Sequence, residues 1–309
     1  MTNKEIFRKW CASRHDIPLF LRSDWMECIT DQNHWDVALI GKENDVQAFL
    51  PYFKKRKVGF QLITMPPITP YMGPWLHYPE GQKHATRLSF EKKMMDGLIE
   101  QLPETDRFIQ YFYPTVSNWL PFQWKGFEQT TRYTYILPDL NSLDSIYAGL
   151  QNNVKREIKK AESLLTIAPA EEIATLFQLL EKDYAAKAEK LPITQAYLTR
   201  IFRHLQEKNS GQVFHAVDAN GQVIASILLA WDIHSAYFLA GAAEPKTKTT
   251  GAMSLLLWTA IQHSASVTKA FNFEGSIIEP IERFFRAFGA EQTPYFEIRK
   301  TNSKLLKLL

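Results

Sequence analysis

A short pattern occurs twice in this chain, as GFEQT at residues 126–130 and as GAEQT at residues 289–293. Each copy follows an aromatic-rich segment with the spacing of a short helix, and each leads into an alternating run typical of a β-strand. Because self-similarity at one long interval indicates a chain built from repeated units, the pattern predicts an internal duplication. The alternative is a coincidence between two mixed α/β segments.

The second half of the chain predicts an ordered series of elements. The pair Asn220-Gly221 lies between two apolar or alternating runs and favours a tight turn between antiparallel strands. Pro280 suits the first turn of a helix, and Gly289 suits the position just after its end. The expected order is strand 211–218, strand 223–231, strand 235–242, helix 252–266, strand 269–276, helix 280–288 and strand 291–299.

The first half can be laid on the same plan. It predicts a hairpin (35–41 and 46–56), a strand (61–67), a helix (82–102), a strand (107–114), a short helix (118–126) and a strand (128–137). Helices are expected between the halves at 144–165, 171–190 and 195–208, because apolar residues recur there at three- and four-residue spacing. The sequence therefore predicts an α/β (α+β) fold with two domains, residues 1–137 and 138–309. Each domain is expected to have a mixed, mostly antiparallel sheet flanked by helices.

Composition limits the kind of protein. A length of 309 residues suits two domains, and a net charge of +3 is too small to imply nucleic-acid or membrane binding by itself. We therefore expect no DNA partner. Cys11 and Cys28 provide neither a disulfide framework nor a zinc spacing, and the histidines show no metal-binding motif, so no metal is expected. Because no leader or membrane-length apolar run is present, we expect a cytoplasmic protein without a transmembrane segment.

The order of a strand, two helices, three strands, a helix, a strand, a helix and a strand resembles the GNAT acyltransferase fold, here present twice. The segments NNVKREIKKAES (152–163) and FNFEGSIIEPIERFFRAFGAEQTPYFEI (271–298) resemble the FemAB-like branch of that superfamily. The branch includes peptidoglycan-bridge aminoacyltransferases with tandem GNAT domains and BioF2-like acetyltransferases. The resemblance covers roughly residues 133–299 and extends to the first half mainly through the repeated plan. The long coiled-coil arm of the tRNA-using Fem enzymes is not visible.

The resemblance implies that acetyl-CoA or another acyl-CoA binds where the loop after the fourth strand meets a helix. Unpaired amides and the helix dipole favour a phosphate at such a position. The family pattern is Arg or Gln, two residues, Gly, one residue, then Gly or Ala, whereas this sequence has KTTGAM at 248–253. The candidate donor-binding residues are Lys248, Thr249, Thr250, Gly251 and Ala252. The alternative is a solvated loop that simply precedes a helix.

The densest basic cluster consists of Lys155, Arg156, Lys159 and Lys160, on the helix face away from the apolar positions. Arg156 and Lys159 are candidate ligands of an anionic acceptor or carrier, because a guanidinium group binds phosphate or carboxylate through two hydrogen bonds. The alternative is a solvated polar face, since Glu157 and Glu162 are interleaved with the cations.

Three further residues are candidates for the chemistry. Glu274 lies at the end of a strand, near the cleft that GNAT folds open beside their fifth strand, and a carboxylate there could take the proton from an amine. Tyr237 in the fourth strand could donate a proton to the leaving thiolate, and Tyr71 lies in a Pro- and Gly-shaped loop that could line an acceptor pocket. The alternatives are a capping carboxylate for Glu274 and core packing for the two tyrosines.

These features favour an acyltransferase that moves an acyl group, acetyl above all, from acyl-CoA directly to an amine of a sugar, amino acid or cell-envelope precursor. The C-terminal domain would hold the donor, and the N-terminal domain would be a degenerate copy on the acceptor side. One alternative is a Fem-type transfer from aminoacyl-tRNA to a peptidoglycan precursor. Another is a GNAT scaffold that binds a ligand without catalysis. The sequence leaves monomer and dimer open.

Overall fold

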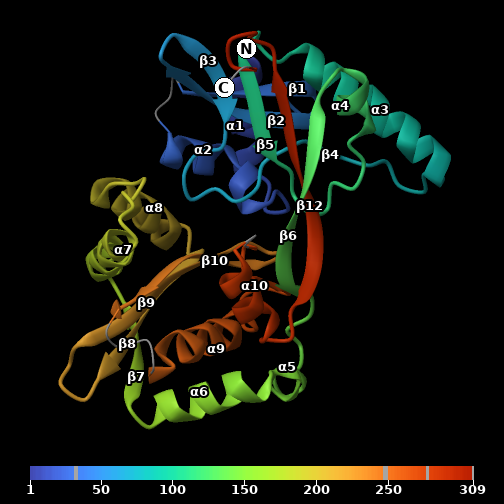
Figure 1. Ribbon diagram of the computed structural model, residues 1–309. Coiled ribbons are helices and arrows are strands. Elements are labelled where there is room, and N and C mark those ends of the chain that lie inside the picture. The colour runs from blue at the N-terminus through green and yellow to red at the C-terminus, as the bar shows by residue number, and fades with distance from the viewer. Residues whose placement is uncertain (31–33, 246–249, 276–277, 308–309) are drawn as a thin grey trace. The chain divides into compact units, whose positions relative to one another are not determined.

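The computed structural model describes residues 1–30, 34–245, 250–275 and 278–307 (Figure 1). The chain divides into two compact units, one made of Met1–Arg132 with Pro294–Leu309 and the other of Tyr133–Thr293. The unit boundaries fall inside two strands, β6 (Glu128–Leu137) and β12 (Glu291–Thr301). These are the two strands that the repeated pattern opens. The predicted domains, 1–137 and 138–309, remain a prediction.

The first unit is a sheet with helices on both faces. The strand order is β1-β2-β3-β5-β12, β4 pairs with β2, and all pairs are antiparallel except β3 with β5. The elements are α1 (Asn3–Ala12), η1 (Leu19–Leu21), α2 (Ser23–Ile29), β1 (Trp35–Lys42), β2 (Asp45–Lys57), β3 (Phe60–Thr64), β4 (Trp75–Leu76), α3 (His84–Glu100), β5 (Arg107–Tyr111) and α4 (Leu120–Trp124). Because side chains alternate along a strand, β2 packs Phe49 against Phe7 of α1 and places Ala48 and Leu50 in the core with α3.

The second unit contains the elements that carry most of the predicted site. Its strand order is β6-β11-β10-β9-β8-β7, and β10 with β11 is the parallel pair. The elements are α5 (Leu143–Gly149), α6 (Asn152–Glu162), β7 (Leu165–Ala170), α7 (Ala174–Ala186), α8 (Gln195–Glu207), β8 (Gly211–Asp218), β9 (Val223–Trp231), β10 (Ala236–Ala243), α9 (Ala252–Ser264), β11 (Phe271–Asn272) and α10 (Glu279–Arg286). The predicted mixed, mostly antiparallel sheets flanked by helices are confirmed.

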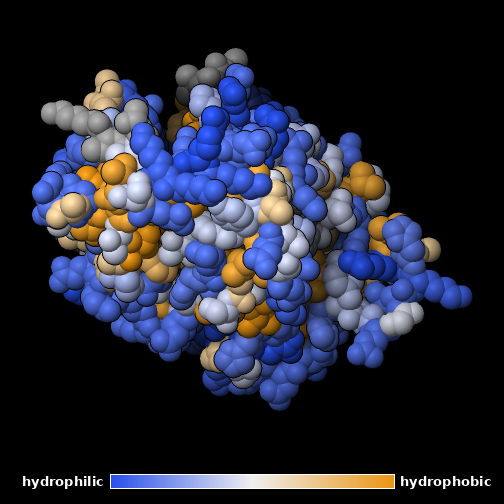
Figure 2. Space-filling model, turned by 90° about the horizontal axis from the view of Figure 1, so that it is seen from below, coloured by the Kyte–Doolittle hydropathy of each residue, from blue (hydrophilic) through white to orange (hydrophobic). Residues whose placement is uncertain are grey.

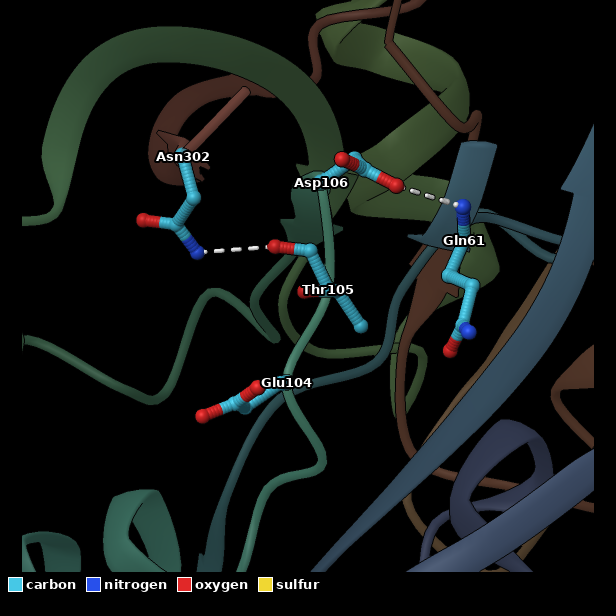
Figure 3. A pocket seen from close by; sticks show the side chains of 5 residues that line it. All are labelled: Gln61, Glu104, Thr105, Asp106 and Asn302. Carbon is cyan, nitrogen blue, oxygen red and sulfur yellow. Dashed lines mark hydrogen bonds between the residues drawn. The ribbon is translucent and has the colours of Figure 1, made fainter. Parts of the chain in front are cut away.

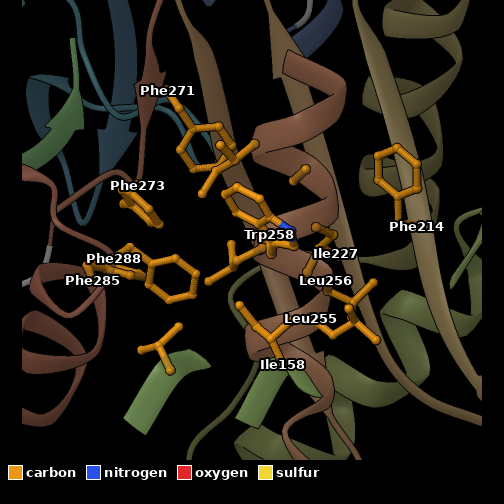
Figure 4. Packing of buried hydrophobic residues seen from close by; sticks show 14 of the residues in the cluster. Ile158, Phe214, Ile227, Leu255, Leu256, Trp258, Phe271, Phe273, Phe285 and Phe288 are labelled. Carbon is orange, nitrogen blue, oxygen red and sulfur yellow. The ribbon is translucent and has the colours of Figure 1, made fainter. Parts of the chain in front are cut away.

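A single apolar core joins α6, α9 and α10 to one face of this sheet. Figure 4 shows Leu256 and Trp258 of α9 among side chains from the strands, with Phe285 and Phe288 beside them. Phe273, just after β11, lies 5.2 Å from Phe285 between ring centroids. The core therefore fixes the segment after β11 against α10.

One predicted element is wrong in a way that matters for the site. Residues 144–165 do not form one helix, because the chain becomes extended at Leu150 (φ −60°, ψ 142°) and separates α5 from α6. The N–H of Gln151 donates to the carbonyl of Ala287 instead of continuing the helix. Leu165, expected on the helix face, begins β7, which lies at the end of the strand order and tolerates Pro169 because an edge strand need not donate there.

Candidate functional site

The strands β10 and β11 separate soon after they meet. They pair at only two positions, Ala236 with Phe271 and Tyr237 with Asn272. β10 continues to Ala243, whereas β11 ends at Asn272. The register of β10 against β9 also shifts between Phe238 and Ala240, and such a bulge bends a strand. The described part of the chain thus leaves the second half of β10 unpaired on the side of β11.

Glu274 lies directly after β11 in an unusual backbone conformation. Its φ is 53°, in the left-handed region that residues other than glycine rarely occupy. The next residue, Gly275, passes so close to β6 that a Cβ atom there would lie 1.8 Å from the carbonyl oxygen of Tyr133. The backbone at the end of β11 is therefore fixed by its neighbours, and such strain is typical of functional positions.

The carboxyl group of Glu274 is poorly solvated. The residue is partly buried, and its Oε1 atom is inaccessible to solvent and has no hydrogen-bond partner among the described residues. Burial raises the pKa of Glu274 well above the usual range of a glutamate. A carboxyl group whose pKa is raised by burial is a stronger base than an ordinary glutamate, so it can accept a proton from an ammonium ion and release it again.

Tyr237 lies in β10 beside Asn272 of β11, but its hydroxyl is directed elsewhere. The ring is buried, with 3% of the residue exposed, and the phenol donates a 3.1 Å hydrogen bond to Oδ2 of Asp232. Asp232 belongs to the turn between β9 and β10, where it also accepts from the N–H of Ser235. The role of Tyr237 as proton donor to a thiolate stays a prediction.

The candidate donor loop is described in part, since Lys248 and Thr249 lie outside the described residues. Gly251 (φ 77°) precedes α9, and the Oγ1 atom of Thr250 accepts a 3.3 Å hydrogen bond from the N–H of Ala252. A Cβ on Gly251 would lie 2.4 Å from the carbonyl oxygen of Glu157 on α6. Glycine is therefore required here both by the backbone angle and by the approach of α6.

A carboxylate lies at the first turn of α9. The hydroxyl of Ser254 donates a 2.5 Å hydrogen bond to Oε2 of Glu157. The sequence shows Glu157 only as a charge interleaved with the cations. Its contact with Ser254 joins two residues that are 97 positions apart in the chain, so no local pattern predicts it. The first turn of α9, directly after the candidate phosphate loop, is thus in contact with an acidic side chain.

Arg156 and Lys159 lie together on the exposed side of α6. With Asn152 and Lys155 they line an open pocket of about 490 Å³. The ammonium of Lys155 donates to the carbonyl of Ala148, but Arg156 and Lys159 make no ion pair with a described residue. Figure 2 views the molecule from below, the direction in which α6 lies in Figure 1, and hydrophilic residues cover most of this face.

Tyr71 belongs to the first unit, where it is buried with 1% of the residue exposed. Its ring lies 5.3 Å from that of Tyr113 and 5.2 Å from that of Tyr295, between centroids. The structure thus places it in a tyrosine cluster of the first unit, whereas β11, α6 and α9 belong to the second. Its predicted role in acceptor binding is not tested by this packing.

A second pocket, of about 450 Å³, lies in the first unit and is lined by Gln61, Glu104, Thr105, Asp106 and Asn302 (Figure 3). Its polar groups largely bond to one another. Asp106 accepts from the N–H of Gln61, and the Asn302 amide donates to the carbonyl of Thr105, both at 2.8 Å. The first bond joins the segment before β5 to β3, and the second holds Asn302 of the C-terminal segment beside the same residues.

Two general features of the described residues bear on the site. No group of three or more His, Cys, Asp and Glu side chains is arranged to hold a metal ion in the part of the chain that the structure describes. Within the same residues, every helix is too short or too polar to cross a membrane.

Comparison with known proteins identifies the class. Residues 148–270 match the family model described as an acetyltransferase (GNAT) domain. The chain therefore contains a GNAT-type transferase domain. No protein of curated function matches the sequence.

Solved structures extend the similarity to nearly the whole chain. A structure of FemX is 12% identical, with a TM-score of 0.66 over 96% of both chains. The C-terminal domain of a putative lysylphosphatidylglycerol synthetase from Agrobacterium fabrum is 14% identical, with a TM-score of 0.61 over 99% of this chain and 95% of that one. A tandem GNAT protein from the clavulanic acid pathway is 9% identical, with a TM-score of 0.53 over 96% and 93%. The FemAB-like GNAT fold expected from the sequence is confirmed.

Proposed function

We propose that the protein transfers an acyl group, most simply acetyl, from acyl-CoA to an amine of a sugar, amino acid or cell-envelope precursor. The observation that carries this proposal is Glu274, a poorly solvated carboxyl group with a raised pKa at the point where β10 and β11 separate. The cytoplasmic location expected from the sequence remains part of the proposal.

The proposed reaction needs one base and no covalent enzyme intermediate. Glu274 takes a proton from the ammonium group of the acceptor, and the free amine attacks the thioester carbonyl carbon. A carbon–nitrogen bond forms, the nitrogen loses its second proton to water, the carbon–sulfur bond breaks, and the CoA thiolate leaves and is protonated. Tyr237 is the proposed donor of that proton. Its hydroxyl would first have to break its hydrogen bond to Asp232 and turn toward the sulfur.

Donor binding is proposed at the start of α9, through the backbone of residues 248–252. The positive φ of Gly251 and the N-terminus of α9 support it, because amides at a helix N-terminus attract phosphate. A tandem GNAT protein of similar fold, from the clavulanic acid pathway, was solved without AcCoA, and at 9% identity its likeness to this chain extends to the fold alone.

A second donor, aminoacyl-tRNA, is favoured by a different observation. Arg156 and Lys159 are exposed, lack ion-pair partners among the described residues and line one open pocket, which suits a polyanionic carrier. The acceptor would then be a peptidoglycan or lipid precursor of the cell envelope. Under the first proposal the same pair binds an anionic group of the acceptor.

Calorimetric titration with acetyl-CoA tests the donor. A variant at Gly251 would be a poor probe, because any Cβ there collides with α6. Thr250→Asp and Thr250→Asn form a better pair, since both side chains can accept from the N–H of Ala252 and they differ in charge. We expect acetyl-CoA to bind the wild type and Thr250→Asn alike and to bind Thr250→Asp at least about tenfold more weakly, a difference of about 1.4 kcal/mol.

The outcomes separate the two donors. If none of the three proteins binds acetyl-CoA or free CoA, the acyl-CoA proposal fails. Retention of a charged aminoacyl-tRNA by the wild type, lost in Arg156→Ala with Lys159→Ala, would then support the second donor. Equal binding of acetyl-CoA by Thr250→Asp would show that the donor phosphates lie elsewhere.

A further inference from the structure

We propose that Thr134 and Asn272 are positioning residues that hold the carboxyl group of Glu274 in its buried place. The inference rests on the proposed role of Glu274 as the base. Neither Thr134 nor Asn272 was singled out by the sequence, and neither touches a substrate in this scheme. They act through the backbone of the segment that follows β11.

The hydrogen bonds between these residues form a closed chain. The hydroxyl of Thr134 donates to Oδ1 of Asn272 at 2.6 Å, and the N–H of Glu274 donates to the same oxygen at 2.8 Å. The N–H of Gly275 donates to Oγ1 of Thr134 at 3.0 Å. Two side chains thus satisfy the two successive backbone N–H groups on either side of the Glu274 side chain.

Burial makes these bonds strong constraints. Thr134 is 0% exposed and Asn272 is 3% exposed. Inside a protein, an N–H group that loses its acceptor has no water to replace it, so each bond opposes any movement of the segment. The same bonds favour the left-handed backbone of Glu274 (φ 53°), which would otherwise relax.

The arrangement links two strands. Thr134 lies in β6 and Asn272 in β11, and the neighbouring pair Asn272 and Ile136 is in register across the ladder. Gly275 completes the fit, because only a residue without a Cβ can pass the Tyr133 carbonyl at this distance. The direction of the Glu274 side chain is therefore set from β6, a strand far from it in sequence.

The test detects the burial of the Glu274 carboxyl group through the pH dependence of stability, so it needs no substrate. Because burial raises the pKa of Glu274, the unfolded chain loses this proton at a lower pH than the folded chain does. The stabilisation that this pKa difference gives the folded chain is fully present below the ordinary pKa of glutamate, about 4.3. It is lost as pH rises through the pKa of Glu274 in the folded chain. The unfolding equilibrium constant should increase by up to tenfold per pH unit in that window.

The contributions of other ionisable groups to the pH dependence of stability are removed by subtraction. The elements around β11 carry these ionisable residues: Glu128, Arg132, Tyr133 and Tyr135 on β6, Tyr237 on β10, and Glu279, Glu282, Arg283 and Arg286 on α10. Burial, not their charges, raises the pKa of Glu274. Urea unfolding from pH 4 to pH 8 is therefore measured for each protein with and without Glu274→Gln. The difference between the two curves isolates the contribution of Glu274.

We expect the difference to depend on pH in the wild type and to flatten in Thr134→Val and in Asn272→Ala, where the carboxyl group can reach water. Thr134→Ser keeps the hydroxyl and should restore the dependence. Ser264→Ala is the matched control, since it removes another fully buried hydroxyl of the same unit, which donates to the carbonyl of Ala260. It should lower stability equally at every pH and leave the difference unchanged.

A purely structural role predicts another result. Thr134→Val and Asn272→Ala would then lower stability at all pH values while the pH-dependent difference stays as in the wild type, and the proposal would be wrong. If Thr134→Val does not fold, Asn272→Ala and Thr134→Ser decide the question. A flattened difference in a protein that transfers no acyl group would overturn the proposed function and leave the positioning role intact.

Discussion

At the scale of single residues, the protonation of Glu274 sets the expected pH dependence of catalysis. Only the ionised carboxylate can act as a base, and burial raises its pKa well above the usual range. The ionised fraction therefore grows as pH rises, and kcat should rise with it and level off above the folded pKa. Glu274→Gln should lower kcat by about 10²- to 10⁴-fold and abolish the rise, in a thiol-release assay with a working acceptor.

The matched control for this prediction is Glu279→Gln. Glu279 is an exposed glutamate in the first turn of α10, five positions further along the chain. It should keep both the rate and the pH profile of the wild type. A wild-type profile that is flat from pH 5 to pH 9, or unchanged in Glu274→Gln, would assign the base to another group.

The sequence could indicate Glu274 but not the residues that hold it. A carboxylate at the end of a strand in FNFEGS is visible in a local segment. The bond from Thr134 to Asn272 joins residues 138 positions apart, and its existence depends on which strands become neighbours. Likewise, nothing local shows that Gly275 passes a carbonyl of β6. Side-chain contacts across a sheet follow from topology, which the local pattern does not fix.

At the scale of elements, α6 is expected to tune the donor loop through Glu157. Its carboxylate accepts from Ser254 in the first turn of α9, where the helix dipole already favours negative charge. A donor phosphate at this end of α9 would be repelled by that carboxylate. Glu157→Gln keeps an acceptor for the Ser254 hydroxyl and removes the charge, so acetyl-CoA should bind about two- to fivefold more tightly, as measured by calorimetry.

Glu162→Gln serves as the control, because Glu162 is an exposed residue at the last position of the same helix. It changes the net charge by the same amount and should leave the affinity unchanged. Raised salt should reduce the gain in Glu157→Gln, since screening weakens interactions between exposed charges. Equal or weaker binding by Glu157→Gln would mean that the phosphates do not approach the first turn of α9.

Elements with a strong local signal were predicted well. The turn at Asn220-Gly221 joins β8 to β9 as expected, and the carboxylate of Asp218 accepts from the N–H groups of Asn220 and Gln222. The strand β7 was missed because Leu165 continues the apolar spacing of α6 and Pro169 argues against a central strand. The expected strand 269–276 shortens to β11, since only two residues pair before the chain turns into the Glu274 segment.

At the scale of the whole molecule, each copy of the repeated pattern leads into a strand, β6 or β12, but the compact units follow the three-dimensional pairing rather than the chain order. Residues Pro294–Leu309 belong with Met1–Arg132, because β12 pairs with β5 from Glu297 to Thr301. The predicted division at residue 137 would instead assign Pro294–Leu309 to the C-terminal domain, residues 138–309. A repeated pattern in a sequence can indicate where strands begin, but it does not show which compact unit each strand completes.

Truncation distinguishes these two divisions. Ile298 is fully buried in the core of the first unit, and Glu297 pairs with Arg132 at 2.6 Å. Loss of a buried Ile side chain alone costs about 2–5 kcal/mol, a large part of the roughly 5–15 kcal/mol that stabilises a domain. A chain that ends at Thr293 should therefore unfold its first unit, although residues 1–132 are intact.

Tryptophan fluorescence gives the readout, because six of the eight tryptophans lie within residues 1–132. The chain that ends at Thr293 should show red-shifted emission and rapid proteolysis within those residues. A chain that ends at Asn302 keeps β12 and the bond from Asn302 to Thr105, and it should resemble the full chain. Native emission after truncation at Thr293 would instead show that residues 1–137 fold without β12, as two sequential domains require.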